Sequence, residues 1–189
     1  MNDTLHVADG GEPAAIRVPF NVFPNVTAKT PSKSARVTVA EIAAAIQKPR
    51  QVQSKKQAPL VTLVSYHEGA NSRGIADIES VHAVYGDIDE GFDPHAFEAG
   101  WAELERLGAQ AIAHQTYSHT PEAPRWRVIV FLDEPISPEH YRDCWEGLND
   151  IFGGMLDENA KDCARLNYWP SCPPGETRET RTINIAEAA

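Results

Sequence analysis

The sequence lacks the features that mark secreted and membrane proteins. It has no apolar run close to the roughly 18–20 residues that span a bilayer, and Asp3 and Asp9 fall where a secretion signal requires a basic start and an apolar block. Its three cysteines form no C-x-x-C pair, which argues against a disulfide framework and a cysteine-rich zinc site. We therefore expect a cytoplasmic protein with no membrane partner.

Basic charge is also scarce. The 189 residues include 17 lysines and arginines against 27 acidic residues, which gives a net charge of −10. Such a chain is a poor candidate for coating nucleic acid through a broad basic face. Residues 27–57 are the exception, because seven lysines and arginines lie there with Glu41 as the only acid. This stretch is either a solvated arm or a surface that contacts phosphates.

The length of the chain fits one globular domain. Residues 1–36 are rich in glycine, proline, asparagine, threonine and serine and show no sustained periodicity, so we expect a flexible lead-in there. Residues 37–189 are expected to form a single domain that carries the function.

Strand and helix patterns alternate after the lead-in. Thr38 and Glu41 have the spacing of a capping box before a short helix, and Asp93 followed by Pro94 predicts the start of a longer one. The predicted strands are residues 60–66, 81–88, 109–117, 125–132 and 180–185, and the predicted helices are residues 39–47, 94–107 and 138–152. This order predicts an α+β fold, an antiparallel sheet with helices on one face.

Two acids end the second predicted strand, in Gly86-Asp87-Ile88-Asp89. Successive side chains of a strand alternate between its faces, so Asp87 and Asp89 should lie side by side. Two adjacent carboxylates repel one another unless a cation lies between them, and oxygen ligands of this kind suit Mg²⁺ or Mn²⁺ bridging to phosphates. The alternative is that they are two solvated acids at a strand end.

A second group of candidates surrounds the turn between the next two strands. Arg125 and Arg127 should share one strand face, and guanidinium groups bind phosphate oxygens in pairs. Together with the preceding hydroxyls and histidine they would form a triphosphate clamp. In the alternative, the arginines pair with surface carboxylates. The preceding residues are Ser118, His119 and Thr120.

The third group follows the glycine pair that ends the last predicted helix. Asp157, preceded by an apolar residue, is a candidate third metal ligand, although it could equally be the N-cap of the next turn. Asp162 is the other candidate for the third acid. Arg165 lies three residues beyond Asp162, so the two could pair on a helical turn.

Taken together, the strand-end Gly-Asp-Ile-Asp, the Ser-His-Thr thirty residues beyond it, the Pro-Arg-Trp-Arg that opens a strand and the Leu156-Asp157 pair resemble the archaeo-eukaryotic primase superfamily. Within that superfamily the chain looks most like the primase-polymerase domains of phage and plasmid replication proteins. The resemblance covers residues 60–170. It implies an RRM-like antiparallel sheet beside a smaller N-terminal α/β unit, so that residues 37–189 would be one primase-polymerase-like catalytic domain.

The resemblance also implies an activity, template-directed transfer of nucleotides from NTPs or dNTPs on a single-stranded DNA template, with two bound Mg²⁺ or Mn²⁺ ions. A replicative helicase is a further expected partner. By this resemblance Asp87, Asp89 and Asp157 hold the metal ions, while His119 contacts the β- or γ-phosphate. The nucleotide would also meet Arg125, Arg127 and the hydroxyls of Ser118 or Thr120. Arg165 either approaches the nucleotide or orients Asp162.

Other functions compete with this one. A non-catalytic adaptor of the same fold, binding nucleic acid or protein, is the main alternative. A nucleotide-sugar glycosyltransferase and a metal-dependent nuclease also use paired acids with a divalent ion. His82 and His114 fall in predicted strands without a second histidine at ligand spacing, so we expect them to be packed residues.

Overall fold

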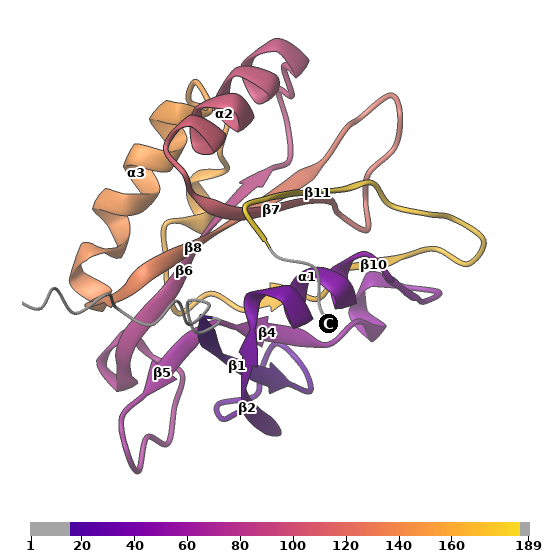
Figure 1. Cartoon of the computed structure of the whole chain (residues 1–189). Helices are drawn as coiled ribbons and strands as arrows, with labels where there is room; N and C mark the ends of the chain where they lie inside the picture. Colours follow the sequence, from indigo (N-terminus) through magenta and orange to yellow (C-terminus); the bar gives the residue numbers. More distant parts are fainter. Residues whose placement is uncertain (1–15, 186–189) are drawn as a thin grey trace, which may run out of the picture.

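The computed structural model describes residues 16–185, which form two principal sheets and three α-helices (Figure 1). The helices are α1 (Val39–Ile46), α2 (Pro94–Arg106) and α3 (Tyr141–Ile151). The strands are β1 (Arg17–Phe23), β2 (Lys33–Thr38), β3 (Arg50–Gln51), β4 (Leu60–Thr62), β5 (Val64–Tyr66), β6 (Ile78–Ile88), β7 (Gln110–Gln115), β8 (Trp126–Ile136), β9 (Asn167–Tyr168), β10 (Ser171–Cys172) and β11 (Thr180–Ile183). The α+β class is confirmed.

The larger sheet has five strands in the order β11-β7-β8-β6-β5, and every neighbouring pair is antiparallel. Strand β8 lies between β6 and β7, which are therefore parallel to each other and are joined through α2. This is the split β-α-β arrangement of RRM-like and ferredoxin-like sheets. The expected RRM-like sheet is therefore present, with β5 and β11 at its edges.

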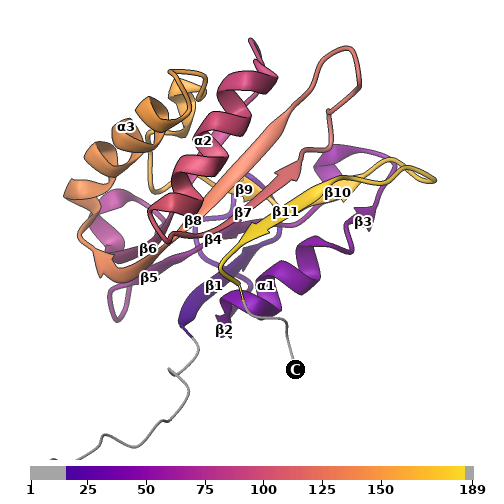
Figure 2. The ribbon, with the colours of Figure 1, turned by 45° about the horizontal axis from the view of Figure 1, so that its top comes forward.

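Both long helices cover one face of this sheet (Figure 2). Helix α2 begins where predicted, because the Asp93 side chain accepts backbone hydrogen bonds from His95 and Ala96 and Pro94 occupies the first turn. The buried side of α2 places Phe97 against Trp126 of β8, with ring centroids 5.0 Å apart. This layer forms the larger apolar core.

The opposite face of the sheet packs on the N-terminal unit, whose four-stranded sheet has the order β2-β1-β4-β9. Helix α1 contributes Ile42 and Ile46 to the core between them, and Tyr85 and Ile129 come from β6 and β8. The capping box predicted for α1 is formed by its Thr38 and Glu41 side chains. The smaller N-terminal α/β unit is thus confirmed as the layer opposite α2 and α3.

The prediction that residues 1–36 form a flexible lead-in is wrong for residues 16–36. Strand β1 and most of β2 lie there, and β1 pairs with both β2 and β4. Val18 and Phe23 are almost fully buried, so this segment supplies core residues although its composition resembles a loop. The non-local pairing with β4 decides the structure here, which local composition does not record. Residues 1–15 lie outside the described residues.

Two predicted elements are divided in the structure. The run at residues 60–66 becomes β4 and β5, which belong to different sheets and are separated only by Leu63. The helix predicted at residues 138–152 is a short 3₁₀ turn, Pro138–His140, followed by α3. In the part of the chain that the structure describes, no helix is both long and apolar enough to cross a membrane.

Candidate functional site

Three polar residues form a row across the five-stranded sheet on the face that meets the N-terminal unit. The strand register pairs Asp87 of β6 with Arg127 of β8, and Arg127 with His114 of β7. Residues paired in this way project from the same face of a sheet. Strand alternation therefore placed Asp87 correctly, and Ile88, the next residue of the strand, lies in the core on the helix side.

Asp87 and Arg127 form a buried ion pair in which both carboxylate oxygens are used. Arg127 donates from Nε to Asp87 Oδ1 at 2.6 Å and from Nη2 to Oδ2 at 2.9 Å, and only 3% of Asp87 is exposed. Arg127 Nη1 donates to the carbonyl oxygen of Tyr168 at 2.9 Å. Burial raises the pKa of Asp87, but the charge and hydrogen bonds of Arg127 outweigh it and leave this pKa below its ordinary value.

A second acid–arginine pair lies two residues away, just after the end of β6 and just before the start of β8. Arg125 Nη1 is 3.4 Å from Asp89 Oδ1, and both side chains are partly exposed. Each acid of the Asp-x-Asp motif thus faces one arginine of the Arg-x-Arg motif. The sequence predicted that each pair shares a face, but it assigned the acids to metal and the arginines to phosphate. The structure instead pairs them with each other.

The Asp157 segment is held beside Asp87 through its backbone. The N–H of Asp157 donates to the carbonyl oxygen of Asp87 at 2.7 Å, and the Leu156 side chain lies directly over Gly86. The Asp157 carboxylate accepts a hydrogen bond from the N–H of Asn159 at 3.1 Å and caps a 3₁₀ turn. The first and third motifs are therefore adjacent, and the alternative reading of Asp157 as an N-cap is also correct.

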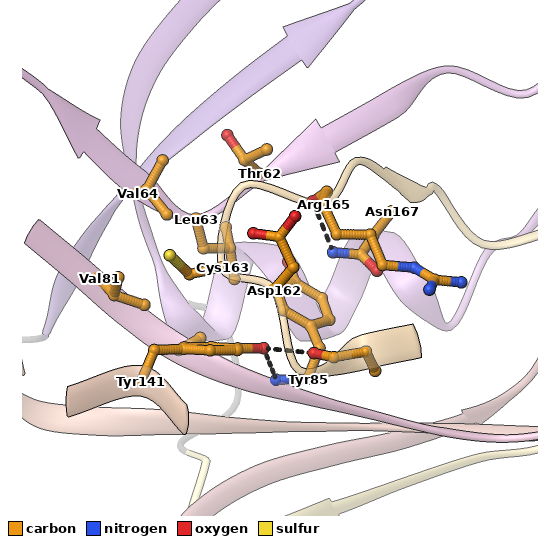
Figure 3. Close-up of a pocket in the computed structure, with 12 residues that line it drawn as sticks. Thr62, Leu63, Val64, Val81, Tyr85, Tyr141, Asp162, Cys163, Arg165 and Asn167 are labelled. Atoms are coloured by element: carbon orange, nitrogen blue, oxygen red, sulfur yellow. Dashed lines mark hydrogen bonds between the residues drawn. The ribbon is translucent and has the colours of Figure 1, made fainter. Parts of the chain in front are cut away.

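The side chain of Arg165 is directed to Asp87 and not to the side chain of Asp162, although the Arg165 N–H donates to the Asp162 carbonyl oxygen at 3.1 Å. Its Nη2 is 3.8 Å from Asp87 Oδ2, and its Nη1 donates to the carbonyl oxygen of Asn159. Figure 3 shows the guanidinium group of Arg165 directed away from the carboxylate of Asp162. Asp162 accepts a hydrogen bond from the N–H of Ala164 at 2.8 Å. The expected side-chain pair of Asp162 with Arg165 is not formed.

The close-up in Figure 3 is centred on a small cavity next to the segment that carries Asp162 and Arg165, and its volume is about 10 Å³. Tyr141 lies on its wall, where its hydroxyl accepts from the N–H of Tyr85 and donates to the carbonyl oxygen of Ala160, each at 3.3 Å. A space of this size holds about one water molecule. It is a packing feature behind the site and is too small for a nucleotide.

The loop between β7 and β8 carries the Ser-His-Thr motif. His119 Nδ1 accepts a hydrogen bond from the backbone N–H of Arg125 at 3.2 Å, so the histidine is fixed beside the second ion pair. Partial burial, and then the charge of Arg178, lower the pKa of His119. Thr120 Oγ1 accepts from the N–H of Ala123 at 3.1 Å and shapes the turn, while Ser118 is exposed.

The sequence assigned three further residues of this region no role in the site, and it expected His114 only as a packed residue, which its burial confirms. His114 is fully enclosed, and burial followed by the charge of Arg127 lowers its pKa to about 4. Arg178 donates to the carbonyl oxygens of Thr116 and Tyr117, at 2.9 Å each, and braces the Ser-His-Thr loop. Lys55 is half-buried, with Nζ 5.1 Å from the centre of the Tyr168 ring. Only Lys55 had a signal, as part of the basic stretch at residues 27–57.

This arrangement does not fit a divalent metal ion. Among residues 16–185, no three histidine, cysteine, aspartate or glutamate side chains are grouped so that they could hold one. Both oxygens of Asp87 already accept guanidinium protons, and the nearest additional charges are positive. The predicted Mg²⁺ or Mn²⁺ centre of Asp87, Asp89 and Asp157 is therefore not assembled in this structure.

An antiparallel split β-α-β sheet, an N-terminal α/β unit on its open face and paired acids at a strand end define a primase-polymerase-like domain. Residues 70–178 match the VapE N-terminal domain, which is more than half of the chain, and the chain belongs to this family. The resemblance stated from the motifs is thereby confirmed at the level of the family.

One solved structure is similar to the chain, the cyanophage S-2L primase-polymerase (PrimPol), AEP domain. The similarity has a TM-score of 0.44 and 15% sequence identity, and it covers 92% of this chain and 85% of that chain. No curated protein sequence matches the chain significantly.

Proposed function

We propose that the chain is a template-directed nucleotidyltransferase, a primase-polymerase of phage or plasmid type replication that takes nucleotides from NTPs or dNTPs. The observation that carries this proposal is the convergence of three separate motifs at one strand end. Asp87 and Asp89 lie there, and the Asp157 N–H donates to the carbonyl oxygen of Asp87. His119 of the Ser-His-Thr motif accepts a hydrogen bond from the backbone of Arg125, whose side chain pairs with Asp89. Membership of the VapE N-terminal domain family supports the same class.

In this proposal the partly exposed side of the cluster receives the nucleotide. Arg125 and His119 lie together on this side, and the partly exposed Arg165 lies next to Asp87. Guanidinium and imidazole groups placed in this way suit the phosphate oxygens of a triphosphate. Single-stranded DNA is the proposed template, and a replicative helicase is the proposed partner.

A second function is favoured by one observation, the engagement of Asp87 by Arg127. A carboxylate whose two oxygens accept guanidinium protons is not free to bind a metal ion, which fits a non-catalytic module that binds nucleotide or nucleic acid. The fold and family are the same in both proposals. They differ in whether nucleotides are joined.

Incorporation of labelled nucleotides on a single-stranded DNA template, with Mg²⁺ or Mn²⁺, tests the first proposal. Asp89→Asn is the informative variant because Asp89 is partly exposed and the protein should remain folded. The control is Asp133→Asn, an exposed acid toward the other end of β8. We expect incorporation by the wild type and by the control, and a loss of at least about 100-fold in Asp89→Asn.

Three other results would change the conclusion. Wild-type protein that binds nucleotide but joins none would support the non-catalytic module. Shortening of the template would indicate a nuclease. Equal incorporation by Asp89→Asn and wild type would remove the Asp-x-Asp pair from the active site.

A further inference from the structure

We propose that the acid–arginine cluster binds the triphosphate tail of a nucleotide without a divalent metal ion, and that Lys55, not Arg127, contacts the phosphates. The cluster consists of the acids and arginines described above together with the neighbouring Lys55. This inference rests on the proposed function, since it names the part of the substrate that the same site holds.

Arg127 is already fully engaged. Its Nε and Nη2 donate to Asp87 and its Nη1 donates to the carbonyl oxygen of Tyr168. The side chain is 9% exposed, so a ligand would have to break a buried ion pair to reach it. Arg127 therefore positions Asp87 and Tyr168, and the sequence-based assignment of Arg127 to phosphate binding passes to another cation.

Among the described residues, Lys55 is the cation of the cluster that has no acidic partner. Its ammonium group lies over the ring of Tyr168, whose carbonyl oxygen holds Arg127. Within residues 16–185, no carboxylate lies within ion-pairing distance of Lys55. Burial first, and the charge of Arg127 second, lower its pKa, while Asp89 and Asp87 act in the opposite direction. Lys55 is thus close enough to interact with both acids and with Arg125 and Arg127, but it is paired with no acid.

The turn that carries Lys55 is well fixed before any ligand arrives. The Gln57 side chain accepts hydrogen bonds from the N–H groups of Gln53 and Ser54, at 3.0 and 3.3 Å. The hydroxyl of Tyr117 donates to the carbonyl oxygen of Gln53 at 3.1 Å. Tyr117 immediately precedes Ser118, so the Lys55 turn and the Ser-His-Thr loop are joined. A cation held in place in this way loses little entropy on binding.

The charge of the cluster suits an anion that carries several charges on adjacent atoms. The three acids Asp87, Asp89 and Asp157 are outnumbered by four cations, namely Lys55, Arg125, Arg127 and Arg165. A further cation would be repelled, whereas a triphosphate would relieve the crowding of positive charge. A phosphodiester chain, with a single charge per nucleotide, matches this compact group less well.

Titration calorimetry with inorganic tripolyphosphate in the presence of EDTA tests the inference. Lys55→Gln is compared with Lys56→Gln, a matched control because Lys56 is the exposed next residue of the same turn. We expect the wild type to bind, Lys55→Gln to bind about tenfold more weakly, and Lys56→Gln to match the wild type. Lys55→Arg, which keeps the charge, should recover most of the affinity. Thermal unfolding confirms that each variant is folded.

Three results would overturn the inference. These are a wild type that needs divalent metal to bind tripolyphosphate, equal losses in Lys55→Gln and Lys56→Gln, and a Lys55→Gln loss seen with a single-stranded oligonucleotide but not with tripolyphosphate. The last result would assign Lys55 to the template.

The incorporation assay separates this inference from the proposed function. If tripolyphosphate binds as expected but the wild type joins no nucleotides, the inference stands and the polymerase activity does not. If incorporation is normal and Lys55→Gln leaves the nucleotide KM unchanged, the activity stands and the inference does not.

Discussion

Arg127 of β8 faces Asp87 of β6 across the sheet and donates two hydrogen bonds to its carboxylate, at 2.6 and 2.9 Å. Both residues are buried, and neither has another side chain of opposite charge as close. The charge of each residue therefore offsets the free-energy cost of removing the other charge from water.

Arg127→Met should destabilise the protein strongly, because it leaves the buried Asp87 carboxylate without its two hydrogen bonds from Arg127 and with Arg165, at 3.8 Å, as its remaining arginine. We expect a loss of about 3–5 kcal/mol in the free energy of unfolding, measured by urea denaturation. The double variant Asp87→Leu/Arg127→Met should recover much of this loss, since it removes both charges. Arg142→Met, which breaks an exposed helix pair with Glu146, should have little effect. Similar small effects in both arginine variants would contradict the buried pair.

Gly86→Ala should also destabilise the protein, for a steric reason. A Cβ atom at this position would lie 2.8 and 2.9 Å from the two methyl groups of Leu156. Leu156 must shift, and with it the Asp157 segment, at a cost of about 1–3 kcal/mol in urea denaturation. Gly147→Ala in α3 is the control, because a Cβ there meets no atom within 4 Å and should stabilise the helix by about 0.5–1 kcal/mol. A neutral Gly86→Ala would show that this contact does not fix the segment.

Two substitutions of Asp157 separate its cap from its charge. Asparagine can still accept the hydrogen bond of Asn159, so Asp157→Asn should keep its thermal stability, whereas Asp157→Ala should lose about 1 kcal/mol. If Asp157 acts as the proposed third acid, nucleotide incorporation should fall at least about 100-fold in both variants. Asp93→Asn, at the cap of α2, should retain both stability and activity. Full activity in Asp157→Asn would leave this carboxylate with a capping role alone.

The buried His114 should make stability depend on pH between about 6.5 and 4. Its pKa is about 4 in the folded protein against 6.5 in the unfolded chain, so within this window the unfolded state binds more protons. The free energy of unfolding should therefore fall as the pH falls, by roughly 3 kcal/mol. Asp87 acts differently, because its lowered pKa confines its effect to pH values below its ordinary pKa.

Urea denaturation at several pH values tests this prediction. His114→Gln should lack the extra slope between pH 6.5 and 4, whatever its overall stability, while His82 and His119 titrate in both proteins. Parallel profiles for variant and wild type would show that His114 is not held neutral by burial.

Elements with local signals could be predicted from the sequence. Helix α2 was expected at residues 94–107 and spans Pro94–Arg106, because its N-cap, its first proline and its apolar spacing all lie within the segment itself. Strand β1 was missed because its partners, β2 and β4, are up to 41 residues away along the chain. No local pattern states which distant segment completes a sheet.

The candidate site, like the sheets, could be predicted from the sequence only in part. Alternation along a strand placed Asp87 and Asp89 on one face and Arg125 and Arg127 on one face. Whether those faces meet depends on the register of β6 against β8, which the sequence alone did not give. The sequence offered pairing of the arginines with carboxylates as an alternative, but which acid faces which arginine came from the structure. The proximity of Lys55 to this pair arises in the same way, from the packing of the N-terminal unit on the sheet.

The passage of the chain from β4 into β5 restricts how the two layers can move. Only Leu63 separates a strand of one sheet from a strand of the other, and its side chain is buried between them. Sliding of one layer over the other would have to disrupt the backbone pairing of β4 or of β5. The groups contributed by the two layers therefore keep their spacing in the free protein, and a ligand of the proposed site would find these groups already in place.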